Sequence, residues 1–287
     1  MPVIDVNGLK INYLRIDGQS DTGPRPVAVF VHGLGTDSLA SFYLTLAAPV
    51  SMAGIDVVAY DLRGHGRTDQ PPDGYTIGHF TSDLTGLLDA LGIERPVHLV
   101  GNSFGGTLAF ALAVTCPERV ASVVSLESEP PTQAWADRLR STLAYVKRDL
   151  AREDTYLWLA STFGAHHARL SRTAYQRLSA TTMAEEIPDG PLLELEDLDR
   201  LTCPVLSIIG DEGFQADDPY LLQALLPDCR TVIIDGQDHS VLVEAHREVR
   251  RLVIDWVLEH HLTGDATADV TAVTAVTEGA PTGADAG

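Results

Sequence analysis

The sequence feature that most constrains the fold of this chain is a serine between two glycines, in the run Gly101–Gly105 (Gly-Asn-Ser-Phe-Gly). The apolar, β-rich residues 97–100 before it predict a buried strand, and the Ala/Leu-rich residues 107–114 after it predict a buried helix. So tight a turn brings the flanking positions against neighbouring backbone, which favours glycine there, and exposes the Ser103 hydroxyl at the helix N-terminus. The pattern indicates either a nucleophilic serine or an ordinary glycine-rich corner, and other parts of the chain must decide between them.

Strand and helix signals alternate along most of the sequence. Asn7-Gly8 lies between two alternating apolar runs and predicts a hairpin. Continuous apolar runs predict buried parallel strands at 27–31, 55–60, 97–100, 120–126, 205–209 and 231–234. Helices are expected between them, ending in a closing helix at about 241–261. This alternation predicts an α/β fold with a mostly parallel, doubly wound sheet.

One long stretch, residues 128–196, has no strand signal and carries aromatic side chains at roughly helical spacing. It predicts an inserted group of about three or four helices whose aromatics mainly form their own core. A few of these aromatics should face a pocket, and we expect Trp135 and Trp158 among them. The tail is rich in Thr, Ala and Gly and predicts disorder. The predicted organisation is a core of residues 1–127 and 197–262, a helical insertion of residues 128–196 and a disordered tail of residues 263–287.

The composition excludes several classes of function. The 287 residues include 40 acidic and 20 basic side chains, a net charge of −20, which argues against nucleic-acid and anionic-membrane partners. No apolar run approaches the roughly 18 residues that span a bilayer, and the N-terminal residues lack the pattern of a secretory signal. The three cysteines are widely spaced, without the spacing of zinc ligands, and predict free thiols. We therefore expect a cytoplasmic protein with no metal site that acts on a small molecule.

A serine nucleophile needs a base, an acid that orients the base, and donors for an oxyanion. His239 lies in a glycine-flanked loop after the last predicted strand, at the sheet edge where active sites of such folds lie, and is the expected base. The expected oxyanion donors are the backbone N–H groups of Phe104 and of Leu34, in the loop that follows the strand at 27–31. Gly33 should let this loop approach the substrate closely.

Five motifs in this order resemble the α/β-hydrolase superfamily over nearly all of residues 1–262. They are His32-Gly33-Leu34-Gly35, Asp61-Leu62-Arg63-Gly64-His65-Gly66-Arg67-Thr68, Gly101-Asn102-Ser103-Phe104-Gly105-Gly106, Pro117-Glu118-Arg119-Val120 and Gly236-Gln237-Asp238-His239. The resemblance implies the α/β-hydrolase fold, in which residues 128–196 would form a cap domain over the substrate. It also implies the chain order nucleophile, acid, histidine, which Ser103 and His239 respect.

The sequence departs from most of this superfamily at the acid. Most relatives carry an Asp three residues after the glycine that ends the penultimate strand; that glycine is Gly210 here, and the third residue on is Gly213. Another subset, similar to zearalenone lactonases, carries a Glu after the preceding strand, 24 residues beyond the nucleophile. Glu127 has that spacing from Ser103. We prefer Glu127 as the acid, with Asp211 as the alternative.

The resemblance implies a serine hydrolase that cleaves a carboxylic ester or lactone through an acyl-enzyme, without a cofactor. The aromatic, lightly charged residues 128–196 suggest a medium-sized apolar substrate. Haloalkane dehalogenases and epoxide hydrolases use an Asp where this chain has Ser103, which argues against both activities. A carbon–carbon bond hydrolase acting on a β-diketone or ring-cleavage product and a cofactor-free perhydrolase remain alternatives. A non-catalytic ligand receptor on the same fold is the alternative from another class.

Overall fold

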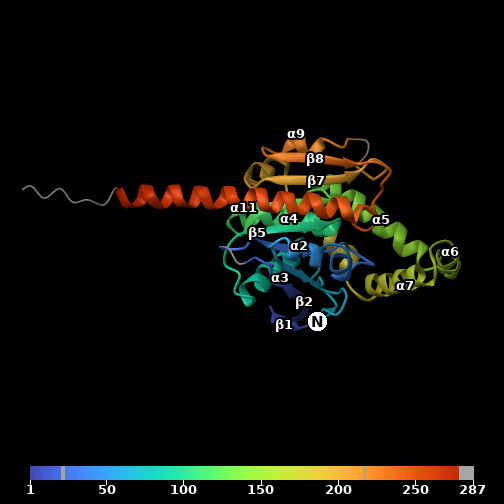
Figure 1. The fold of residues 1–287 in the computed structure, drawn as a ribbon. Helices are drawn as coiled ribbons and strands as arrows, with labels where there is room; N and C mark the ends of the chain where they lie inside the picture. Colours follow the sequence, from blue (N-terminus) through green and yellow to red (C-terminus); the bar gives the residue numbers. More distant parts are fainter. Residues whose placement is uncertain (21–22, 216–217, 278–287) are drawn as a thin grey trace, which may run out of the picture.

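The computed structural model describes residues 1–20, 23–215 and 218–277, with residues 262–277 described by their backbone alone. Eight strands form one sheet with the order β1-β2-β4-β3-β5-β6-β7-β8 (Figure 1). The strands are β1 (Val3–Val6), β2 (Leu9–Ile16), β3 (Val27–Val31), β4 (Asp56–Tyr60), β5 (Val97–Asn102), β6 (Val120–Leu126), β7 (Val205–Gly210) and β8 (Cys229–Ile234). The first pairings, β1 with β2 and β2 with β4, are antiparallel, and all others are parallel.

The predicted α/β fold class and the mostly parallel sheet are thus confirmed. The hairpin turn at Asn7 and Gly8 has φ angles of 53° and 80°, the left-handed pair that two-residue hairpins favour. The order of the parallel strands reverses between β3 and β5, because β4 lies on one side of β3 and β5 on the other. Ligands of open α/β sheets bind beyond the carboxyl ends of strands at such a reversal, and Ser103 follows β5 there.

Helices cover both faces of the sheet. They are α1 (Ala40–Phe42), α2 (Ala48–Met52), α3 (Ile77–Ala90), α4 (Phe104–Thr115), α5 (Gln133–Asp149), α6 (Glu153–Phe163), α7 (Ala165–Ala180), α8 (Met183–Glu186), α9 (Leu221–Leu225), α10 (Val241–Glu244) and α11 (His246–Thr277), with a π-helical turn η1 (Tyr43–Ala47) and 3-10 turns η2 (Pro117–Arg119), η3 (Ile187–Asp189) and η4 (Leu195–Arg200). Val29 and Val31 belong to the core cluster that contains α3 and α4, whereas Ala28 and Phe30 belong to the cluster under α2 and α11. Successive strand residues thus bury opposite faces, which explains the continuous apolar runs.

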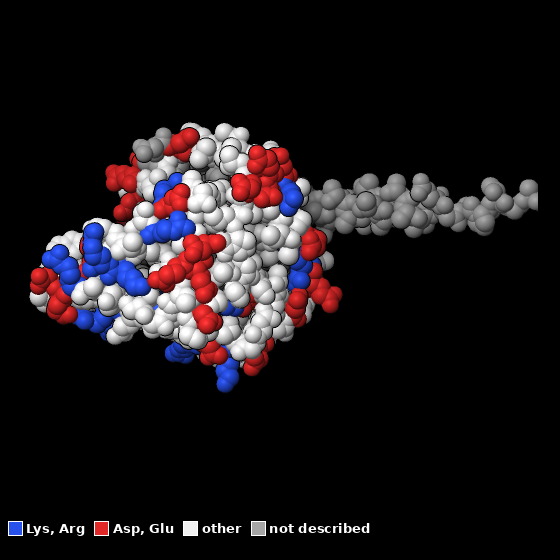
Figure 2. All heavy atoms as spheres, turned by 180° about the vertical axis from the view of Figure 1, so that it is seen from behind, with Lys and Arg blue, Asp and Glu red and all other residues white. Residues whose placement is uncertain are grey.

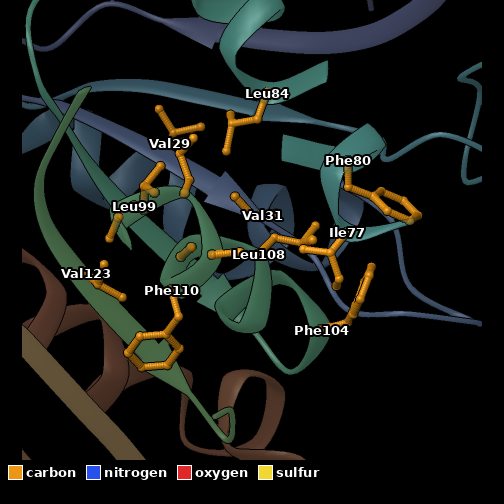
Figure 3. Packing of buried hydrophobic residues seen from close by; sticks show 14 of the residues in the cluster. Val29, Val31, Ile77, Phe80, Leu84, Leu99, Phe104, Leu108, Phe110 and Val123 are labelled. Atoms are coloured by element: carbon orange, nitrogen blue, oxygen red, sulfur yellow. The ribbon is translucent and has the colours of Figure 1, made fainter. Parts of the chain in front are cut away.

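Helix α4 lies in the centre of one core layer. All but the last of its twelve residues are buried, and Figure 3 shows Leu108 and Phe110 directed at the same apolar cluster as Val29, Leu99 and Val123 of neighbouring strands. Burial of each large apolar side chain contributes about 1.5–3 kcal/mol. The helix that begins immediately after Ser103 is therefore anchored along its length.

The stretch 128–196 forms α5, α6, α7 and α8 with two 3-10 turns, between β6 and β7. Figure 1 shows α6 and α7 side by side, projecting from the body of the molecule. Lys and Arg side chains gather on this projection, whereas Asp and Glu spread over the rest of the face seen in Figure 2. One of these cations, Arg172 on α7, pairs with Glu153 on α6. The division into core and cap domains stays a prediction.

Helix α11 continues to Thr277, past residue 263, where the tail predicted to be disordered begins. Residues 278–287 of that tail lie outside the described residues, and disorder of the tail stays a prediction. Over the described part of the chain, no helix is both long enough and apolar enough to span a bilayer. Cys116, Cys203 and Cys229 are unpaired and partly buried.

Candidate active site

Ser103 lies at a strained turn between β5 and α4. Its φ and ψ angles are 51° and −120°, a conformation that a residue with a Cβ rarely adopts and that costs on the order of 1–3 kcal/mol. A Cβ on Gly101 would collide with the backbone of Gly105 and Gly106, and one on Gly105 would collide with the backbone of Val31. Only glycine therefore fits at positions 101 and 105. The buried helix α4 holds Ser103 in its strained conformation.

The Ser103 hydroxyl forms a hydrogen bond with an imidazole. His239, in the loop between β8 and α10, places Nε2 3.0 Å from Ser103 Oγ. Its side chain is half exposed, so part of the ring remains accessible to a ligand beside the serine. The loop also holds Asp238, whose carboxylate accepts hydrogen bonds from the Ser240 hydroxyl and N–H at 2.6 Å and 2.9 Å. These hydrogen bonds lower the pKa of Asp238 and hold its carboxylate against Ser240.

The carboxylate behind the imidazole belongs to Glu127. Its Oε2 lies 3.4 Å from His239 Nδ1, while its Oε1 accepts a hydrogen bond from the Gly210 N–H. Glu127 is 1% exposed, and its backbone N–H donates to Ile208 O at 2.9 Å. Its φ of 49° lies in the left-handed region, unusual for glutamate. The residue directly after β6 thus places a buried carboxylate against two donors, the imidazole and the Gly210 N–H, which a buried carboxylate requires.

The alternative acid, Asp211, lies elsewhere. It is exposed, and its Oδ1 accepts a hydrogen bond from the Gln237 N–H at 3.2 Å. A Cβ on Gly213, the position of the aspartate in most relatives, would lie 2.6 Å from Glu127 Oε2. The Glu127 carboxylate therefore occupies the space into which a side chain at position 213 would point, and the two acid positions exclude each other.

The two residues expected to supply the oxyanion donors line the same cavity as Ser103. Phe104 opens α4, and its N–H is one of the helix donors that have no intrahelical acceptor. Leu34 follows β3 and lines the cavity beside Ser103. Gly33 is also close, since a Cβ at that position would lie 3.4 Å from Ser103 Cβ. The structure thus brings Leu34, Gly33 and Phe104 together around the serine.

Two buried imidazoles brace the loop that carries Leu34. The Leu62 N–H donates to His32 Nε2 at 3.0 Å, so Nδ1 bears the proton and donates to Gly33 O at 2.7 Å. The Gly35 N–H donates to His65 Nε2 at 3.1 Å. Burial lowers the pKa of His32, and that of His65 falls well below its usual range. Both rings therefore stay neutral, which their acceptor roles require.

Sequence reasoning missed two further residues at this loop. Asp37 Oδ2 accepts from the Gly33 N–H at 2.8 Å, and its Oδ1 accepts from the Ser38 N–H at 2.8 Å. Arg177, on helix α7 of the insertion, donates from Nη1 to Gly35 O although the two residues are 142 positions apart. The only sequence signal for Asp37 was a cluster of helix-capping residues, and Arg177 belongs to no motif.

A cavity of about 460 Å³ opens beside Ser103 and His239. Its apolar wall includes Trp135, Leu139 and Phe214, and the Trp135 ring stacks on Phe104 with ring centroids 6.4 Å apart. The structure brings the predicted Trp135 to the cavity. It does not bring Trp158, and this prediction requires correction: on α6, Trp158 is 56% exposed and packs edge-on against Phe163.

The charged groups of the cavity are mainly acidic. Glu129, Glu212 and Asp238 line it together with Arg138, whose guanidinium donates to Glu129. Among the described residues of the wall, Arg138 is the only Lys or Arg. Within the described ranges, no group of three or more His, Cys, Asp or Glu side chains is placed to hold a metal ion.

The sequence matches one family model and is similar to several curated proteins. The model of the alpha/beta hydrolase fold matches residues 26–245. The putative 2-succinyl-6-hydroxy-2,4-cyclohexadiene-1-carboxylate synthase of Bacillus subtilis (strain 168) is 27% identical over 264 residues, covering 83% of this chain and 93% of that protein. Epoxide hydrolase 3 of Siraitia grosvenorii is 35% identical over 125 residues, covering 43% of this chain and 37% of that protein. The chain spans only 29% to 43% of the length of three curated relatives, of which this epoxide hydrolase is one.

Two solved structures have the same fold as this chain. The enol-lactonase from Burkholderia xenovorans LB400 superposes with a TM-score of 0.66 over 90% of this chain and 100% of that chain, at 24% identity. Est816, an N-acyl homoserine lactone degrading enzyme, superposes with a TM-score of 0.63 over 88% and 98%, at 22% identity. At these identities the likeness shows the fold alone. The family model, by contrast, matches well over half of the sequence, and the chain belongs to the alpha/beta hydrolase fold family.

Proposed function

We propose that the protein is a serine hydrolase that cleaves a carboxylic ester or lactone through an acyl-enzyme. The observation that carries the proposal is the hydrogen-bonded series Ser103–His239–Glu127, in which the imidazole contacts the serine through Nε2 and the carboxylate through Nδ1. A nucleophile, a base and an orienting acid are the groups that acyl transfer needs.

The proposed reaction begins at the serine. The Glu127 carboxylate accepts a hydrogen bond from the Nδ1–H of His239, which leaves Nε2 unprotonated and able to take the Ser103 proton as Oγ attacks the substrate carbonyl. The N–H groups of Leu34 and Phe104 stabilise the oxyanion, a contribution worth about 10²–10³-fold in rate for each donor. His239 then protonates the leaving oxygen.

The second half of the proposed reaction uses the same groups. Water enters beside His239, whose imidazole takes one proton as the oxygen attacks the acyl carbonyl, and Ser103 leaves with a proton from the imidazole. Each turnover thus consumes one water and regenerates the serine. Half of the His239 side chain is exposed, which leaves a path for this water.

The cavity supports a neutral, partly apolar substrate. Its one cation, among the wall residues described, is held by Glu129, and Glu212 and Asp238 add negative charge. A ligand with two carboxylates, such as the compound in the name of the Bacillus relative, would meet net repulsion there. Three unpaired cysteines support a reducing compartment, such as the cytoplasm, as the place of action.

Epoxide opening receives no support from the proposed nucleophile, although epoxide hydrolases are among the relatives. Attack of Ser103 Oγ on an epoxide carbon would form an ether, which has no carbonyl for water to attack in a second step. The enzyme would stall after one turnover. A carbonyl substrate avoids this, since the acyl ester that it forms is hydrolysable.

The test is hydrolysis of p-nitrophenyl butyrate and of a panel of lactones, with labelling by a fluorophosphonate. We expect Ser103→Ala to lose turnover and labelling, whereas Ser161→Ala, at an exposed serine of α6, should behave as the wild type. Turnover that persists in Ser103→Ala would refute the serine mechanism. Absence of both turnover and labelling in the wild type would favour the non-catalytic receptor, and β-diketones or peroxide as co-substrate test the remaining alternatives.

A further inference from the structure

A second cavity adjoins the one beside Ser103. It has a volume of about 480 Å³ and lies between η4, α9 and the chain that follows β6. Three residues, Glu129, Arg138 and Phe214, line both cavities, so the two are contiguous and these side chains form a partition between them. We call the second cavity the side groove.

Five leucines line the side groove, and polar side chains such as Gln215 and Asp218 lie among the other lining residues. Leu198 and Leu222 are 2% and 4% exposed and form its floor. Leu195, Leu221 and Leu225, which also line it, are 60%, 45% and 40% exposed. Leucine side chains that line a cavity offer apolar surface that an apolar ligand can bury, which is favourable by about 25 cal/mol per Å².

The partition between the cavities consists of one aromatic ring and one ion pair. The Phe214 ring packs edge-on against His239, with ring centroids 5.2 Å apart, and is half exposed. Arg138 and Glu129 form an ion pair in which the Arg138 side chain is 53% exposed. The Glu129 side chain is only 16% exposed, so its carboxylate stays paired with Arg138, and the pair presents no net charge to a ligand that passes it.

We propose that the side groove is a subsite for the distal alkyl chain of the substrate, which makes the protein a hydrolase of esters or lactones with a medium to long aliphatic arm. The inference rests on the proposed function. The carbonyl would lie beside Ser103, and the chain would pass Phe214 and the Arg138–Glu129 pair onto Leu198 and Leu222. An uncharged chain suits this course, because the partition charges neutralise each other and the floor offers leucine.

The test is the chain-length dependence of kcat/KM for p-nitrophenyl acetate, butyrate, hexanoate, octanoate and decanoate. Each methylene that enters the side groove should raise kcat/KM by up to about fourfold. In the double variant Leu221→Asn/Leu225→Asn, the loss should grow with chain length and be smallest for acetate. Leu157→Asn, at a leucine of α6 that is 65% exposed and lies outside the groove, is the matched control.

A second measurement separates failure of the subsite from failure of the proposed function. Calorimetric titration of Ser103→Ala with p-nitrophenyl octanoate and butyrate measures binding without turnover. Tighter binding of octanoate that disappears in the Leu221/Leu225 double variant supports the subsite even if the wild type hydrolyses neither ester. Equal binding of the two esters, an unchanged chain-length profile in the double variant, or a change of oligomeric state caused by that variant would each overturn the subsite.

Discussion

The position of the acid can be tested by moving it. Glu127 Oε2 lies 2.6 Å from where a Cβ on Gly213 would stand, so one carboxylate can serve the imidazole from either position but not from both. We expect Glu127→Gly to lower kcat by about 10⁴-fold, about 5.5 kcal/mol of transition-state stabilisation, as loss of an orienting acid does in serine hydrolases. Gly213→Asp alone should also lose activity, because its Cβ meets the glutamate and two carboxylates repel.

The double variant Glu127→Gly/Gly213→Asp should then have a higher kcat/KM than Glu127→Gly, because its new carboxylate can reach the imidazole. Removing the glutamate vacates the space, and the φ of 49° at position 127 suits glycine, which relieves about 1 kcal/mol of strain. Against this, the Gly210 N–H loses its acceptor, at a cost of about 1–3 kcal/mol. The net loss in the free energy of unfolding is therefore about 0–2 kcal/mol, below the roughly 5–15 kcal/mol that native domains have, so a folded protein can be assayed.

The assay is kcat/KM for p-nitrophenyl butyrate, with urea unfolding of each variant. We expect the double variant to recover at least about tenfold over Glu127→Gly, a coupling of about 1.4 kcal/mol or more between the two positions. Glu127→Gly/Gly213→Asn is the matched control and should recover nothing, since it fills the space without a charge. No recovery with Asp, equal recovery with Asn, or wild-type activity in Gly213→Asp would refute the shared-space reasoning.

Three other outcomes follow from the contacts. Asp211→Asn should keep kcat within a few-fold of wild type, since its carboxylate faces the Gln237 N–H, and a loss near 10⁴-fold would make it the acid. Arg177→Met should lower kcat by about 10–100-fold with little change in KM, because it frees the Gly35 carbonyl and shifts an oxyanion donor; a rise in KM alone would show a role in binding instead. Burial lowers the pKa of His98 to about 3, whereas in an unfolded chain it is about 6.5. The unfolded state therefore binds the extra proton between these values, and the free energy of unfolding should fall as pH drops below about 6.5, by up to about 1.4 kcal/mol per unit for this group. His98→Asn should flatten that slope in urea unfolding at several pH values, and an unchanged slope would contradict the assignment.

The features of this protein that depend on neighbouring residues could be predicted from the sequence. Buried parallel strands appear as continuous apolar runs because both of their faces are covered, and β3 and β5 were predicted to within a residue or two. Ser103 was readable because Gly101 and Gly105 stand where no Cβ fits, a constraint that acts within a few residues. His239 was readable from its place after the last strand, since the ends of parallel strands share one edge of the sheet.

Tertiary structure decided what depends on distant contacts. Spacing left Glu127 and Asp211 both open, and only the packing of Glu127 under Gly213 shows which carboxylate reaches the imidazole. Trp135 and Trp158 looked alike at helical spacing, but the orientations of α5 and α6 place one in the cavity and the other in solvent. Arg177 had no local signal, because its partner is 142 residues away. Periodicity fixes which face of an element is apolar, whereas the packing of elements against one another decides which side chains meet.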